Sequence, residues 1–150
     1  MDHHHPKRVR NEILDEAEIQ ELLQGGNHIT VAMCRKDEPY IVTLSYGYDR
    51  ETRCLYFHCA NKGDKLDVLR DNPRVCATII KDNGYLPGKC DHDYETLVLR
   101  GDMVIIEALE EKKHALLVLL NHLEKDPAPI LERNIKSDDS YKAVTMLRLD

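Results

Sequence analysis

The sequence has no tryptophan and only one phenylalanine, and 5% of its residues are aromatic. No apolar run approaches the roughly 20 residues that a membrane-spanning helix needs. The N-terminus also lacks the apolar segment of a secretory signal peptide. These absences predict a soluble, cytoplasmic protein with no membrane partner.

Cysteine occurs five times and never in a C-x-x-C pair. An odd number of scattered cysteines favours reduced, mostly buried thiols over a disulfide framework. Cys90 and His92 are close in sequence, but a structural zinc site needs a second spaced pair of ligands. The sequence therefore predicts no metal site.

Charge of one sign is not concentrated in the chain, since 21 Lys and Arg and 27 Asp and Glu give a net charge of −6. This balance argues against nucleic acid as a partner. With 42% apolar and 32% charged residues, the composition is that of one globular domain over residues 1–150. Residues 1–10 are expected to form a loosely held N-terminal segment.

The spacing of apolar residues predicts helices near both ends of the chain and strands between them. Helices are expected at 13–23, with Asn11 or Asp15 as the cap, at 64–72, and at 108–125, ended by Pro127. Strands are expected at 28–34, 40–46, 54–59, 75–80, 96–107 and 141–149, with a loop over 81–93 and a bulge near Gly101. Consecutive strands joined by short polar turns are typical of a small antiparallel barrel.

The stretch from Cys54 to Cys76 is the most informative part of the chain. It reads as a strand, a basic glycine-containing turn and a helix start, with Lys62 and Lys65 on either side of Gly63 and Asp64 as the expected cap. Backbone N–H groups at a helix start, together with ammonium groups, can bind a phosphate. A basic turn of this kind is also often simply solvated, and the residues alone leave both interpretations open.

Three motifs in this stretch are similar to those of a known family. Tyr56-Phe-His-Cys-Ala, Gly63-Asp-Lys-Leu-Asp-Val-Leu-Arg and Asn72-Pro-Arg-Val-Cys76 resemble the FMN-binding split-barrel proteins related to pyridoxamine 5'-phosphate oxidase, in the branch named for nitroimidazole resistance. The similarity extends through Glu38 to Asp49 and through Cys90 to Gly101. It implies a mainly β fold with flanking helices, a six-stranded antiparallel split β-barrel. The family typically continues past the last strand, so a further C-terminal segment is expected.

The resemblance also implies a site, because in this family FMN lies in a cleft between the two barrels of a homodimer. Lys65, and more weakly Lys62, match the residues that hold the flavin phosphate. The other implied cofactor contacts are Val42, Thr43, Leu44 and Ser45 on one strand, His58 and Cys59 at the end of the next, and Thr96 on a third.

The chain departs from the oxidase pattern at the phosphate site. The Ser-Arg-Lys triplet of the oxidase reads Gly63-Asp64-Lys65 here, which removes an arginine and adds a carboxylate that would repel a phosphate. The oxidase's basic residues for the substrate phosphate have no counterparts. Oxidation of vitamin B6 is therefore disfavoured.

His58 is the predicted catalytic residue. A histidine beside a flavin can donate a hydrogen bond or a proton to a substrate during reduction, and the ordinary histidine pKa near 6.5 suits that task. The alternative is a histidine satisfied by backbone groups or by a partner subunit. Cys59 is more simply a buried small side chain than a reactive thiol, and His114 and His122 are expected to be surface residues.

Three functions follow as hypotheses. The first is an FMN-binding homodimer that reduces a small organic substrate, nitroaromatic or quinone-like, with electrons from NAD(P)H. The second is a non-catalytic flavin carrier or a haem-binding protein of the same fold, with His58 or His28 as an axial ligand. The third is use of a deazaflavin.

Overall fold

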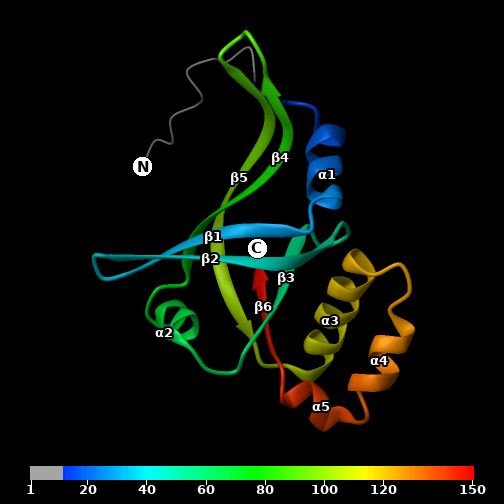
Figure 1. The fold of residues 1–150 in the computed structure, drawn as a ribbon. Coiled ribbons are helices and arrows are strands. Elements are labelled where there is room, and N and C mark those ends of the chain that lie inside the picture. The colour runs from blue at the N-terminus through cyan, green and yellow to red at the C-terminus, as the bar shows by residue number, and fades with distance from the viewer. Residues whose placement is uncertain (1–11) are drawn as a thin grey trace.

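The computed structural model describes residues 12–150, whose six strands close into an antiparallel barrel in the order β1-β2-β3-β6-β5-β4 (Figure 1). The predicted split barrel with flanking helices is confirmed. The N-terminal segment predicted to be loosely held, residues 1–10, lies outside the described residues. The strands are β1 (His28–Arg35), β2 (Glu38–Asp49), β3 (Cys54–Cys59), β4 (Arg74–Leu86), β5 (Asp91–Ile106) and β6 (Thr145–Leu149).

The barrel closes because alternate side chains of each strand point inward. Ile29 and Val31 of β1 are fully buried, as are Tyr46 of β2, Phe57 of β3 and Leu147 of β6. Each such side chain contributes about 1.5–3 kcal/mol by leaving water. The Tyr46 hydroxyl donates to the Leu23 carbonyl at 2.7 Å, and burial raises its pKa to about 12.

The three predicted helices are confirmed as α1 (Glu16–Gly25), α2 (Asp64–Asp71) and α3 (Leu109–Leu123), and Asp15 caps α1 by accepting from the Ala17 N–H at 3.0 Å. Two short helices were not predicted, α4 (Ala128–Asn134) and α5 (Asp138–Lys142). Asp138 and Asp139 favour the start of α5 because acidic groups stabilise a helix N-terminus. The last strand consequently begins at Thr145, later than predicted. No helix within residues 12–150 has the length and apolar character to cross a membrane.

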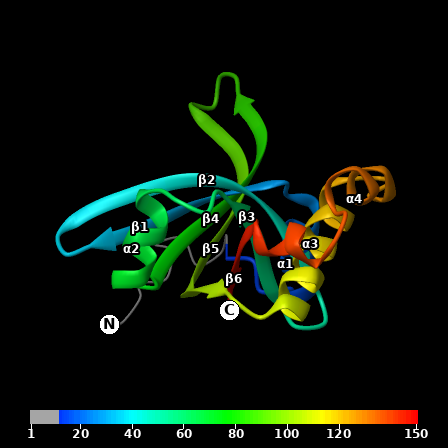
Figure 2. The same cartoon turned by 90° about the horizontal axis from the view of Figure 1, so that it is seen from below.

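The loop predicted over 81–93 is wrong, because β4 and β5 continue there as a two-stranded arm that projects from the barrel (Figures 1 and 2). The charges and glycines that suggested a loop are tolerated in an arm with water on both faces. The strand irregularity lies between Asp82 and Gly84, where Gly84 has a φ of 102°, and Gly101 keeps regular register. Gly101 is needed for another reason, since a Cβ there would collide with the Asp150 carbonyl oxygen at the end of β6.

Helix α3 packs on the outside of the barrel over β2, β3 and β6. A second buried cluster joins them, made by Tyr56, Ile106, Ala115, Leu119 and Met146. At Gly47 of β2 the helix touches the strand backbone directly, since a Cβ there would lie 2.5 Å from the Leu119 Cα. The position of α3 therefore depends on the missing side chain at Gly47.

His114 and His122, expected on the surface, both contact the barrel from α3; His114 is exposed as predicted, whereas His122 is half-buried. The His122 Nε2 lies 2.6 Å from the Gly26 carbonyl oxygen, and its Nδ1 lies 3.4 Å from the Tyr48 backbone nitrogen. The tautomer protonated at Nε2 satisfies both contacts. His114 Nε2 lies 2.8 Å from the Asp49 carboxylate. Burial raises the pKa of Asp49, but hydrogen bonds from His114 and from Glu51 and Thr52 outweigh it and leave the pKa below 3.8.

Candidate functional site

The site forms where β2 and β3 separate. Tyr46 of β2 pairs with Phe57 of β3, and both side chains are fully buried inside the barrel. Because side chains alternate along a strand, the next residues, Ser45 and His58, both point outward. There β2 joins β1, with Ser45 opposite His28, while β3 continues along β6.

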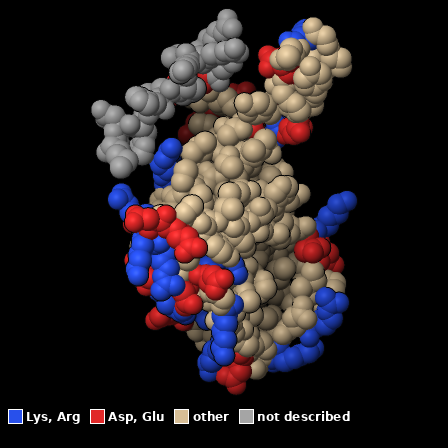
Figure 3. Space-filling view, turned by 60° about the vertical axis from the view of Figure 1, so that its left-hand side comes forward, with Lys and Arg blue, Asp and Glu red and all other residues tan. Residues whose placement is uncertain are grey.

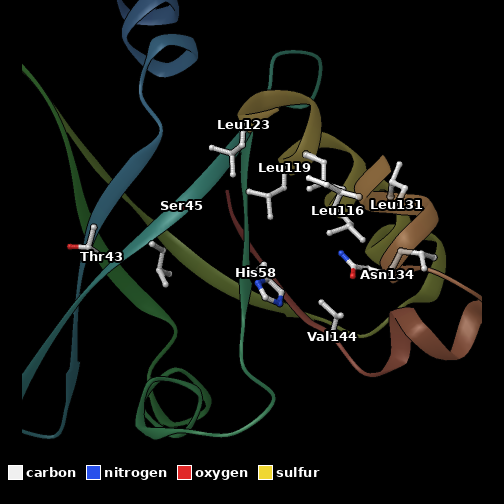
Figure 4. A pocket seen from close by; sticks show the side chains of 13 residues that line it. Thr43, Ser45, His58, Leu116, Leu119, Leu123, Leu131, Asn134 and Val144 are labelled. Carbon is white, nitrogen blue, oxygen red and sulfur yellow. The ribbon is translucent and has the colours of Figure 1, made fainter. Parts of the chain in front are cut away.

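A pocket of about 600 Å³ opens beside this point, between the barrel wall and helices α3 and α4 (Figure 4). This volume is within the range of small-molecule sites. Its lining residues are Thr43, Leu44, Ser45 and His58 from the strands, Leu116, Leu119, Leu120 and Leu123 from α3, Ile130, Leu131 and Asn134 from α4, and Ile135 and Val144.

The pocket has few polar side chains, and most of them have no hydrogen-bond partner among the described residues. Within residues 12–150, the side chains of Ser45, His58 and Asn134 have no hydrogen-bond or ion-pair partner, and Thr43 pairs only with the Thr30 hydroxyl at 3.1 Å. The Asn134 amide points into the pocket toward His58 (Figure 4). These groups can therefore bind a ligand without first breaking an internal hydrogen bond.

The rest of the lining is apolar and incompletely covered. Leu116, Leu120 and Leu123 of α3 are only partly buried, and so are Ile130 and Leu131 of α4. Helix α4 has no buried residue, although it forms one wall of the pocket. A ligand that covered these side chains would gain about 25 cal/mol for each Å² of apolar surface removed from water.

Four of the predicted site residues thus meet in one place: Thr43, Leu44, Ser45 and His58 all line the pocket. Val42 instead packs against the barrel core, and Cys59 is buried within that core. Burial raises the pKa of the Cys59 thiol, partly offset by the positive charge of Lys65. The flavin contacts predicted for Val42 and Cys59 would have to use backbone atoms, since their side chains point inward.

Lys62 and Lys65 lie in the turn after β3 and in the first turn of α2, outside the pocket lining. Neither has an ion-pair partner in the described part of the chain. The prediction that Asp64 caps α2 is wrong, because the helix begins at Asp64 itself and Gly63 occupies the cap position with no side-chain hydrogen bond. The turn is fixed by Asn61, whose amide donates to the Ala143 carbonyl and accepts from the Thr145 hydroxyl at 2.6 Å.

Thr96 lies away from the pocket, on the outward face of the sheet. On this face Thr43 of β2 pairs with Thr30 of β1, which pairs with Thr78 of β4, which in turn pairs with Val98 of β5. Thr96 is two residues from Val98 along β5. Three strand spacings of about 4.8 Å separate β2 from β5. One chain therefore does not bring Thr96 to His58, and its flavin contact stays a prediction.

The same outward face carries exposed apolar side chains. Ile41 is 67% exposed, Ile80 58% and Val98 51%. Figure 3 shows a broad area without lysine, arginine, aspartate or glutamate below the projecting arm. Exposed apolar area of this kind often marks an interaction surface.

The α3 and α4 residues of the pocket, Asn134 among them, were missed by sequence reasoning. The α3 leucines were visible as one side of the helix predicted at 108–125, but nothing in the sequence indicated that they line a pocket. The prolines at 127 and 129 suggested the end of a helix, and they also begin α4. No group of three or more His, Cys, Asp or Glu residues suitable for a metal occurs in the described chain.

Comparisons with known proteins were made on the whole chain. A family model described as pyridoxamine 5'-phosphate oxidase matches residues 15–150. Uncharacterized protein RA0666 of Rhizobium meliloti (strain 1021) is 25% identical over 115 residues, which cover 77% of this chain and 70% of the relative.

Two solved structures are also similar. A candidate 5-nitroimidazole antibiotic resistance protein from Bacteroides thetaiotaomicron is 26% identical, with a TM-score of 0.76 over 91% of this chain and 80% of the other. An FAD and haem binding protein from Mycobacterium smegmatis is 17% identical, with a TM-score of 0.75 over 91% of this chain and 66% of the other.

Proposed function

The chain belongs to the pyridoxamine 5'-phosphate oxidase family, as its motifs predicted, and on that premise we propose that it is an FMN-binding oxidoreductase. Its substrate is a small organic molecule, nitroaromatic or quinone-like, and its electron donor is NAD(P)H. The observation that carries this proposal is His58, an unpartnered imidazole at the mouth of an apolar pocket and next to the hydroxyls of Thr43 and Ser45.

The residues present fit a flavin mononucleotide. Thr43 and Ser45 offer hydroxyls along the outward edge of β2, where the ring and ribityl oxygens would lie. Lys62, Lys65 and the uncapped start of α2 offer ammonium and N–H groups to the phosphate. The Asp64 carboxylate repels a phosphate at this position, but the positive charges of the two unpaired lysines outweigh that repulsion. Hydride and electron transfer are the chemistry that a bound flavin supplies.

His58 donates the proton that the reduction requires. Reduction of a nitro or quinone oxygen needs a proton as negative charge develops on that oxygen. The imidazole is positioned by β3, whose neighbouring residues are anchored in the barrel, and it points toward the pocket. Among the described residues, no lysine or arginine lines the pocket to hold a substrate phosphate, so oxidation of pyridoxamine phosphate is not proposed.

Loss of the lysines should weaken FMN binding. Lys65→Ala is expected to raise the dissociation constant for FMN about tenfold, and the double change with Lys62→Ala further, because each removes a charge-assisted contact worth about 1.5–3 kcal/mol. Fluorescence quenching of FMN during titration measures this. Lys89→Ala, on the projecting arm, is the control and should leave the constant unchanged.

The absorption spectrum after FMN saturation and gel filtration tests the cofactor itself. Retained flavin bands support the proposal, and protein that emerges colourless contradicts it. A haem-binding function is the second candidate, because an unpartnered histidine beside an apolar pocket also suits an axial ligand and the Mycobacterium smegmatis relative is described as binding FAD and haem. A Soret band on adding haem, lost in His58→Ala, would favour it, and retention of a deazaflavin would favour the third hypothesis.

We also propose a homodimer that uses the outward face around Ile41, Ile80 and Val98. A second copy would cover this uncharged face and bring Thr96 of each chain toward the flavin of the other. Val98→Asp is expected to convert the dimer to a monomer, because it buries an unpaired charge in the interface. Analytical ultracentrifugation measures the mass. Leu117→Asp, exposed on α3, is the control, and an unchanged dimer in Val98→Asp would contradict this face.

A further inference from the structure

The pocket beside His58 is chemically uniform: with His58 neutral, none of the lining residues within 12–150 carries a formal charge. Thr43, Ser45, His58 and Asn134 are its polar residues, and every other lining residue is leucine, isoleucine or valine. A charged ligand placed here would lose its water without gaining a lysine, arginine, aspartate or glutamate as counter-charge. Such burial is costly.

The polar groups come from two opposite walls of the pocket. Thr43, Ser45 and His58 come from the strands, and the Asn134 amide reaches from α4 toward His58 (Figure 4). The leucines of α3 and the apolar residues of α4 form the remaining walls. A ligand that places a polar group between His58 and Asn134 is therefore offered hydrogen bonds there, and apolar contact with the surrounding leucines.

We propose that this pocket binds an uncharged, mainly apolar molecule whose one polar group lies between His58 and Asn134. This proposal rests on the proposed function, because it concerns the substrate that His58 would protonate. It adds Asn134 as a specificity-determining residue on a helix that the sequence did not predict.

Three ligands of nearly equal size test the charge rule: 2-naphthamide, 2-naphthoate and naphthalene. Isothermal titration calorimetry or displacement of N-phenyl-1-naphthylamine, at pH 7.5 on the flavin-free protein, measures their binding. The neutral amide is expected to bind at least about tenfold more tightly than the anionic carboxylate. Equal or tighter binding of 2-naphthoate, or no binding of 2-naphthamide up to millimolar concentration, overturns the proposal.

Two variants locate the binding. Asn134→Leu should weaken 2-naphthamide about fivefold to tenfold, toward the affinity of naphthalene, and leave naphthalene itself unchanged. Leu131→Asp should weaken both neutral ligands, whereas Leu117→Asp, outside the pocket, should weaken neither. Both α4 positions lie on a helix without buried residues, so circular dichroism should show intact folding. Unchanged binding in both α4 variants overturns the assignment.

Flavin retention is measured separately on the same preparations. Protein that selects 2-naphthamide but never retains FMN would contradict the flavin proposal and leave the pocket proposal standing. Protein that retains FMN but prefers 2-naphthoate would contradict only the pocket proposal.

Discussion

Replacement of His58 with alanine is expected to lower kcat/KM for reduction of a neutral nitroaromatic, such as 4-nitrobenzamide, about 100-fold, measured on protein saturated with FMN. General acid catalysis contributes about 10² to 10⁴ in rate, and His58 is the one histidine or other ionisable group among the described residues that line this pocket. Steady-state kinetics with NADPH on the FMN-loaded protein give the value.

The pH profile separates proton donation from simple positioning. With His58 present, the rate should fall as pH rises, because a general acid must be protonated to act. In His58→Gln, which keeps a hydrogen-bond donor, this fall should disappear while some substrate affinity remains. His28→Ala, exposed on β1 and outside the pocket, is the matched control. A kcat/KM within twofold of the parent in His58→Ala would remove the histidine from the mechanism.

Gly47→Ala is expected to lower the free energy of unfolding by about 3 kcal/mol, near the upper end of the usual cost of overpacking. The added Cβ would lie 2.5 Å from the Leu119 Cα and 2.7 Å from the Leu119 nitrogen, so either α3 or β2 must move. Neither contact is with a flexible side chain that could rotate away. Urea unfolding followed by circular dichroism measures the loss.

The same substitution should also damage the pocket, because α3 supplies four of its leucines. Binding of 2-naphthamide is expected to fall in Gly47→Ala even where the protein remains folded. Gly25→Ala at the end of α1 is the control, since a Cβ there meets nothing within 4 Å. Equal free energies of unfolding for Gly47→Ala and Gly25→Ala would show that α3 does not contact the β2 backbone at Gly47.

The sequence motifs between Tyr56 and Cys76 predicted the family and the split barrel correctly through their resemblance to that family, whereas strand alternation, a glycine turn and a helix start predicted the local elements of this stretch. The alternation in β2 likewise predicted that Thr43 and Ser45 share an outward face. The arm formed by residues 81–93 could not be predicted in this way. Both its faces meet water, so its strands need no apolar alternation, and their pairing depends on partners across the hairpin.

The sequence by itself therefore determined most of the local elements, since these follow from the periods of strands and helices. Only the tertiary structure decided that Ser45 and His58 meet, because the pairing of Tyr46 with Phe57 fixes the β2 to β3 register. It also decided that α4 closes the pocket with Asn134, which is 76 residues beyond His58 (134 minus 58). Contacts over such separations depend on how whole elements pack, and no local pattern of residue types records them.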